Sequence, residues 1–169
     1  KRNNELKDLV RQGDAAKIAN SWREILSRWR QINLEIVELC LSCVSRWVSW
    51  TEISLIVNPD MLQCLWDVAG QQIPPESANT EQGTVRIAAI VTLNEIVAKK
   101  MPPADKIELL RFLNIMDVLG QLVATPVLSE YRSTSKYYTD LAETVAKLTN
   151  TAAFDIIKVL DNDNIDANT

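Results

Sequence analysis

Two of the three cysteines, Cys40 and Cys43, form a CxxC motif, a spacing that zinc sites and redox-active thiols use. A structural zinc site needs four ligands, and the sequence adds only Cys64 and contains no histidine. The motif also falls in a segment whose apolar residues recur every three or four positions, which predicts the middle of a helix. We therefore expect buried thiols rather than a metal site, and the sequence predicts no cofactor.

Carboxylates offer a second possible chemistry. The stretch 161–166 resembles the start of an EF-hand calcium loop, but that loop requires glycine at its sixth position, where this sequence has aspartate. Two carboxylate pairs are available, Glu35 with Glu38 and Asp161 with Asp163, but each lies in a polar face or tail without the distinctive surroundings of an acid–base pair. Without histidine or a glycine-rich loop, His-based triads and phosphate loops are excluded. We expect a protein that is not an enzyme, and a small helical enzyme is the weaker alternative.

The five tryptophans are the remaining candidates for direct recognition, because aromatic rings can stack on nucleotide bases. All five lie on or beside apolar stripes, which favours packing between paired helices instead. We expect Trp22, Leu41 and Trp50 to be buried in such interfaces. Truncating a buried Trp or Leu to Ala should cost about 2–5 kcal/mol.

Composition limits the classes of protein that remain. The 169 residues are 47% apolar and 24% charged, which favours one folded domain or a short stretch of a repetitive one. No window approaches about 18 uninterrupted apolar residues, so membrane insertion is not expected. The odd number of cysteines favours a reducing compartment. Neither end carries a signal pattern or initiator methionine, and we expect a fragment of a longer protein.

Apolar periodicity and helix-start signals predict six helices in three consecutive pairs. Asp14 and Asn33 are predicted N-caps, and Asn58-Pro59 has the form of a helix start. The pairs span 14–50 (helices 14–31 and 33–50), 59–100 (helices 59–70 and 80–100) and 103–160 (helices 103–124 and 135–160).

The spacing of these pairs indicates the architecture. They begin about 45 residues apart, within the 40–47 of HEAT repeats and well above the 33–34 of ankyrin and tetratricopeptide repeats. The predicted fold is therefore all-α, a HEAT-repeat α-solenoid of about three antiparallel helix pairs. A closed six-helix bundle is the alternative.

Residues 47–58 carry a family resemblance, with the sequence WVSWTEISLIVN. This block resembles exportin-t, the transfer-RNA export branch of the importin-β (karyopherin) superfamily, in its fungal form. The likeness continues in ANSWREIL (19–26), LNEIVAKKM (93–101) and DKIELL (105–110), and covers roughly residues 1–160.

The resemblance implies a nuclear export receptor built as a HEAT superhelix that wraps mature tRNA together with Ran-GTP. Such a receptor passes the nucleoporins of the nuclear pore, shuttles between nucleus and cytoplasm, and releases its cargo when Ran hydrolyses GTP. RNA would be recognised by shape and phosphate backbone, as A-form RNA allows. A generic HEAT-repeat protein–protein scaffold, or a karyopherin with protein cargo, remains the alternative.

In this family the second helix of each pair lines the concave side, so basic residues on those helices are the candidates for RNA or Ran contact. They are Arg46, Arg86, Lys99 and Lys100. The two lysines sit at a helix end, where capping of the helix dipole is the competing explanation. Because the net charge is −4, we expect the chain alone not to bind tRNA measurably at physiological salt. Two uncovered repeat faces predict that the chain self-associates.

Overall fold

The computed structural model describes residues 2–124 and 135–166, which are helical almost throughout and contain no strand. The elements run in the order α1 (Arg2–Gly13), α2 (Ala15–Trp29), α3 (Leu34–Val48), α4 (Ile53–Ile56), α5 (Pro59–Ala69), the 3₁₀ turn η1 (Pro75–Ser77), α6 (Glu81–Ala98), α7 (Pro103–Phe112), α8 (Ile115–Ala124) and α10 (Lys136–Asp166). Within this described part, no helix is both long enough and apolar enough to cross a lipid bilayer.

Two of the three predicted caps are present. The Asn33 side chain accepts a hydrogen bond from the Ile36 amide at 3.1 Å, and Asn58 accepts one from Met61 at 3.0 Å. Each satisfies a backbone donor that the first helical turn leaves without a partner. Asp14 stands at the predicted N-cap position of α2, but its carboxylate pairs with Lys17 and forms no capping hydrogen bond. α1 runs almost directly into α2, and the Asp14 amide itself donates to α1.

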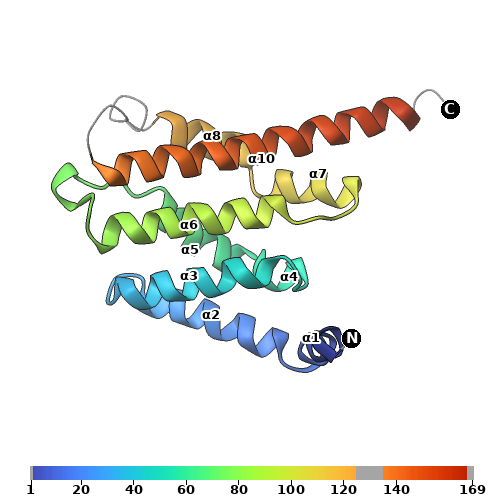
Figure 1. Cartoon of the computed structure of the whole chain (residues 1–169), viewed down its shortest axis with the longest axis horizontal. Helices are drawn as coiled ribbons and strands as arrows, with labels where there is room; N and C mark the ends of the chain where they lie inside the picture. The colour runs from blue at the N-terminus through green and yellow to red at the C-terminus, as the bar shows by residue number, and fades with distance from the viewer. Residues whose placement is uncertain (1, 125–134, 167–169) are drawn as a thin grey trace.

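The helices form two layers (Figure 1). α3, α6 and α10 lie side by side in what we call the front layer, while α2, α5, α7 and α8 make up the rear layer. α2 packs on α3, α5 on α6, and α7 and α8 on α10. Within the described residues α2 and α3 make no substantial contact with α10, as an open stack requires and a closed bundle forbids. The prediction of an all-α HEAT-repeat solenoid is confirmed.

One apolar core runs through the whole stack. The largest fully buried side chains come from every helix pair: Leu41, Ile56, Met61, Leu65, Ile90, Leu93, Ile96, Leu113, Leu141 and Leu148. α6 lies between α3 and α10 and is therefore buried on two faces, so its apolar positions do not form a single stripe. The core continues from one helix pair to the next.

Three features differ from the helices predicted. The helix expected over 103–124 is divided at Asn114, whose φ of 47° is a left-handed conformation that asparagine tolerates better than most residues. The last helix extends through Asp166, so the backbone of the acidic stretch 161–166 is helical and does not form a calcium loop. α1 and α4 were not anticipated, because neither shows a sustained apolar stripe.

Apolar side chains are exposed at both ends of the stack. In α1, Leu6 is 59% and Leu9 67% exposed, and in α10 Phe154 is 65% and Leu160 56% exposed. Isolated exposed apolar residues are common, but clusters on terminal repeats are typical of faces that another repeat covers.

Candidate functional site

The CxxC motif lies within α3 with its two thiols in different environments. Cys40 is buried and its thiol donates to the Trp22 carbonyl at 3.7 Å, whereas Cys43 is exposed. Burial, with a smaller contribution from the neighbouring Cys43, raises the pKa of Cys40 to about 12. A thiol with this pKa remains protonated at neutral pH and is a poor nucleophile and metal ligand.

Two of the three predicted core residues of the first helix pair are buried, with Trp22 8% and Leu41 1% exposed. Trp50, predicted to be buried between the same helices, is only partly buried, because α3 ends at Val48 and Trp50 lies in the turn beyond it. Its ring packs on Trp47 at 4.5 Å between ring centroids, and Arg11 of α1 lies 5.7 Å from its centroid. Trp50 therefore contacts α1, through its ring and Arg11, instead of lying between α2 and α3.

Polar bonds tie the front-layer helices to one another. Ser45 of α3 and Thr92 of α6 share a hydrogen bond of 2.8 Å between their hydroxyls. Further along α6, the Asn94 side chain accepts a bond of 2.9 Å from the Thr151 hydroxyl of α10. Both Thr92 and Asn94 are buried, so these bonds satisfy groups that would otherwise be costly to bury.

Lys99, one of the predicted RNA contacts, is used to join two helix pairs. Its ammonium donates to the carbonyls of Val48 and Thr51 at 2.7 and 2.8 Å, and to that of Ser49 at 3.3 Å. These carbonyls lie at and just beyond the C-terminus of α3, where a positive charge is favourable. Lys99 therefore caps the helix of the neighbouring pair rather than its own, and its donors are not free for a phosphate.

Lys106 repeats this arrangement one helix pair further on. Its ammonium donates to the carbonyls of Val97 at 2.5 Å and Lys99 at 2.6 Å, which close the C-terminus of α6. It also pairs with Asp155 of α10 at 3.0 Å, and it is only 5% exposed. This buried ion pair, which the sequence analysis missed, joins α6, α7 and α10.

Arg86, the second candidate, is 4% exposed and is thus unsuited to an RNA backbone. Its Nε donates to the Ala69 carbonyl of α5 at 2.9 Å, and its Nη1 donates to the Tyr137 hydroxyl of α10 at 3.1 Å. Among the described residues Nη2 has no hydrogen-bond partner. Arg86 lies on a side of α6 that α5 and α10 cover, which argues against the predicted RNA contact.

The sequence does contain a signal for these two buried cations. Lys106 stands at the start of an apolar stripe formed with Leu109, Leu110 and Leu113. Arg86 likewise stands at the start of an apolar stripe in α6, formed with Ala89, Ile90 and Leu93. A charged residue at a stripe position predicts a buried, partnered charge, since such positions face the core.

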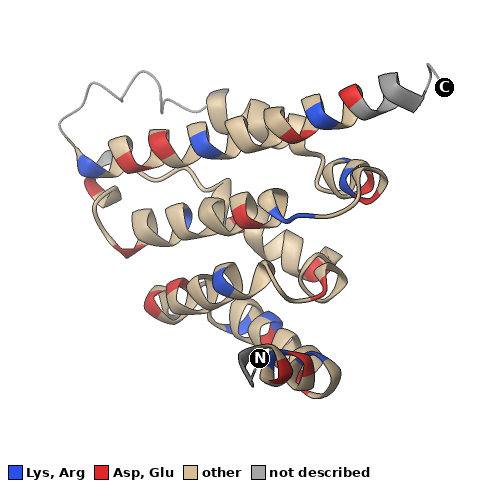
Figure 2. Cartoon of the chain, turned by 45° about the vertical axis from the view of Figure 1, so that its right-hand side comes forward, with Lys and Arg blue, Asp and Glu red and all other residues tan. Residues whose placement is uncertain are grey.

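Arg46 and Lys100 are the two candidates that remain exposed. Arg46 lies in the last turn of α3, and Lys100 follows α6 directly. Neither forms an ion pair within the described part of the chain. Figure 2 shows basic and acidic residues interspersed along the described helices, with no continuous basic face. The arrangement offers isolated phosphate contacts and no catalytic group with a cleft around it.

Comparison with known proteins gives a consistent family assignment. A family described as "Exportin 1-like protein" matches residues 1–93. The chain is 52% identical over 170 residues to the protein named Exportin-T of Phaeosphaeria nodorum, an alignment that covers 99% of this chain and 16% of that protein. It is 48% identical over 166 residues to Exportin-T of Aspergillus oryzae and 46% identical over 169 residues to Exportin-T of Neurospora crassa, covering 98% and 100% of this chain.

The chain spans 16% of the length of these curated relatives. The resemblance to fungal exportin-t found at residues 47–58 and their flanks is therefore confirmed along nearly the whole chain. Since the matched family model covers more than half of its residues, the chain belongs to the exportin 1-like protein family.

Proposed function

We propose that the chain is a segment of a nuclear export receptor that carries mature tRNA together with Ran-GTP, acting as a binding scaffold. The observation that carries this proposal is the 43–52% identity to fungal proteins named Exportin-T over nearly every residue of the chain. The receptor would shuttle between nucleus and cytoplasm and contact nucleoporins on the way. Within it, we assign one helix pair each to residues 14–50, 59–100 and 103–160.

The front layer is the proposed side for RNA or Ran, with Arg46 and Lys100 as its contacts. Both side chains are exposed at the C-terminal ends of front-layer helices, α3 and α6. Lys147 of α10 is also exposed but lies 3.9 Å from Glu95, which reduces its value for a phosphate. Two contacts from this segment imply that most of the affinity comes from other parts of the receptor.

The test uses the longer receptor that contains this chain, with Arg46→Glu and Lys100→Glu introduced together. Affinity for tRNA, measured with Ran-GTP present at several salt concentrations, should fall, and the salt slope should flatten by about one unit per lost phosphate contact. Arg28→Glu in α2, an exposed arginine of the rear layer, is the matched control. Equal affinities and slopes for the double variant and the unmodified receptor would remove these residues from the proposed interface.

The isolated 169-residue chain should not bind tRNA measurably near 150 mM salt, with or without Ran-GTP. Its net charge is −4, and a weakly basic patch is expected to bind no tighter than about 10⁻⁴ M. A titration with labelled tRNA measures this directly. Micromolar binding that persists at this salt would mean that the segment contains a self-contained RNA site.

A receptor for protein cargo, or a general protein–protein scaffold, is the alternative that the acidic surface favours. Glu35, Glu38 and Glu81 line one groove where α3 and α6 begin, and such a groove repels phosphate. Cargo capture by the longer receptor before and after ribonuclease treatment separates the two functions. Retention of the cargo after RNA is removed would support the alternative.

A further inference from the structure

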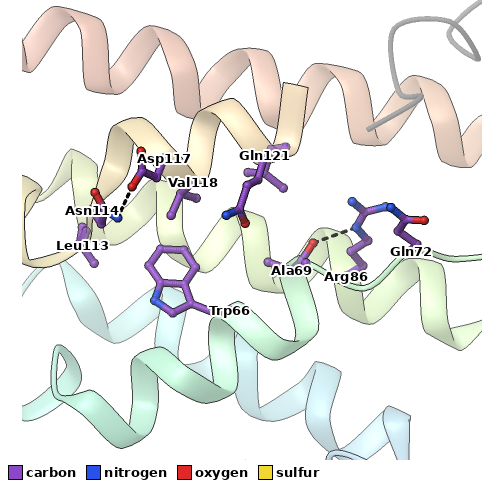
Figure 3. Close-up of a pocket in the computed structure, with 11 residues that line it drawn as sticks. Trp66, Ala69, Gln72, Arg86, Leu113, Asn114, Asp117, Val118 and Gln121 are labelled. Carbon is purple, nitrogen blue, oxygen red and sulfur yellow. Dashed lines mark hydrogen bonds between the residues drawn. The ribbon is translucent and has the colours of Figure 1, made fainter. Parts of the chain in front are cut away.

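A cavity of about 590 Å³ lies in the rear layer between α5 and α8 (Figure 3). Trp66 and Ala69 of α5 contribute to its wall, and Leu113 and Val118 line the opposite side. Gln121 extends from α8 toward α5, and Arg86 of α6 lies at one end. An apolar lining with a few convergent polar groups, in this range of volume, is typical of a ligand site.

Arg86 is the unusual member of this lining. It is more than nine-tenths buried, yet it forms no ion pair in the part of the chain that the structure describes. Nε and Nη1 have neutral acceptors, and Nη2 has no acceptor. Burying a cation without a counter-ion is costly, and an unpartnered guanidinium nitrogen adds to that cost. A carboxylate bound at Nη2 would supply both the missing counter-ion and the missing hydrogen-bond acceptor.

The opposite end of the cavity has the reverse polarity. Asp117 lines it there and accepts a bond of 2.6 Å from the Asn114 side chain. Between the two ends, Trp66 and Val118 provide apolar surface. The cavity therefore fits a ligand with one acidic group, an apolar body and amide donors. An extended peptide has these features when an acidic and an aliphatic residue stand two positions apart, on one face.

We propose that this cavity binds an extended segment of a partner protein, with an acidic side chain directed at Arg86 and the apolar side chain two positions away, on the same face of the peptide, packed on Trp66. The site lies in the rear layer, whereas the proposed RNA contacts lie in the front layer. A protein partner and RNA would thus occupy different layers of the stack. The exposed side chains of Gln72 and Gln121 are the groups that must adjust to admit the peptide.

The test titrates the 169-residue chain with the peptide acetyl-Ile-Ala-Glu-amide and its neutral counterpart acetyl-Ile-Ala-Gln-amide. Two-dimensional NMR follows the Trp66 indole N–H and the Arg86 Nε–H, which report on the two halves of the site. We expect both signals to move with the acidic peptide and the affinity to be about tenfold weaker for the neutral one, the difference that a charge-assisted hydrogen bond makes. Glutarate, which has the carboxylate but no apolar side chains, should shift the Arg86 signal only weakly.

The variant Gln121→Glu adds a negative charge to the cavity at an exposed position, so it can weaken acidic peptides without disturbing the core. We expect it to weaken the acidic peptide about tenfold, while Gln12→Glu, an equally exposed change on α1, should have no effect. Equal binding of the acidic and neutral peptides, or no shift of either signal at millimolar peptide, would overturn the proposal. Glutarate binding as tightly as the acidic peptide would also overturn it, because the apolar half of the site would then be irrelevant.

Discussion

Lys106 and Arg86 are two buried cations with different surroundings: Lys106 has a carboxylate partner, and Arg86 has none among the described residues. Lys106 is 5% exposed, donates to two carbonyls and pairs with Asp155 at 3.0 Å. Arg86 is 4% exposed and donates to two neutral acceptors, and within residues 2–124 and 135–166 it has no carboxylate partner and its Nη2 has no acceptor. The charge of Lys106 is compensated inside the fold, whereas that of Arg86 is not.

This difference indicates that the charge of Lys106 stabilises the packing of the helices. A buried charge with its counter-ion and acceptors in place has no capacity left for a partner molecule. A buried charge without them retains that capacity, and the cavity beside Arg86 gives a partner access from the rear layer. The two ends of α6 thus differ: Lys106 joins neighbouring helix pairs at one end, and the charge of Arg86 at the other end is the one that the proposed peptide would compensate.

The largest expected effect comes from removing the compensated charge. Lys106→Met would remove the nearest cation from the partly buried carboxylate of Asp155 and leave the carbonyls of Val97 and Lys99 without this donor, so the free energy of unfolding should fall by about 3–5 kcal/mol. Urea unfolding measures it. Lys158→Met is the matched control, because Lys158 is 73% exposed, lies 3.9 Å from the same Asp155, and should cost less than about 1 kcal/mol. Similar losses for both variants would show that Lys106 is not a structural ion pair.

A second change tests how tightly the Arg86 end of α6 is packed. A methyl group at Gly83 would lie 2.0 Å from the Ala78 carbonyl oxygen and 2.8 Å from the Tyr137 ring, so Gly83→Ala should cost about 3 kcal/mol. Thermal or urea unfolding of the variant gives the value. Gly120→Ala is the control: nothing lies within 4 Å of its added methyl, and it should stabilise α8 by about 0.5–1 kcal/mol. If both variants were stabilised, the tight contact at Gly83 would be absent in solution.

Arg86→Met tests the uncompensated charge directly. This variant leaves the Ala69 carbonyl and the Tyr137 hydroxyl without a partner but no buried carboxylate, so we expect a loss of about 2 kcal/mol, smaller than for Lys106→Met. Adding Tyr137→Phe should recover part of the loss, because one unsatisfied group is then removed. Urea unfolding of the two single variants and the double variant tests this. A loss for Arg86→Met that matched or exceeded that of Lys106→Met would remove the contrast between the two cations.

The smallest expected effect concerns Lys99. Like Lys106 it has all its donors in hydrogen bonds, and like Arg86 it has no carboxylate partner among the described residues. Burial, and to a lesser degree the nearby charges of Arg11 and Lys106, lowers its pKa from the usual 10.5. The unfolded chain therefore holds this proton more tightly than the folded chain, and the stability contributed by Lys99 should rise with pH from its folded pKa up to 10.5. A ¹³C NMR titration of the lysine side chains should give Lys99 a midpoint below 10.5. A midpoint at or above 10.5 would mean that the hydrogen bonds from Lys99 to its carbonyl acceptors outweigh the effect of burial. The variant Lys99→Met should abolish the rise of the free energy of unfolding with pH between the folded pKa and 10.5.

The sequence by itself determined the all-α solenoid fold and two of its helix starts. These follow from local properties: apolar residues recur at three and four, and Asn33 and Asn58 supply caps to the helices that follow them. Each of these interactions joins residues within a few positions of one another. The break at Asn114 had only a weak local signal, because asparagine also occurs within helices.

The burial and the hydrogen-bond partners of the basic residues Lys99 and Arg86 depend on the tertiary structure. Lys99 was expected to contact RNA or Ran, or else to cap its own helix, but its acceptors lie about 50 positions earlier in the chain, at the end of α3. Arg86 was expected to face RNA, and the groups that bury it belong to α5 and α10. Sequence periodicity reveals which residues share a helix face, but it does not reveal which neighbour covers that face. In a stacked repeat each helix has two such neighbours, so whether a charge is free, paired or left uncompensated depends on contacts between helix pairs.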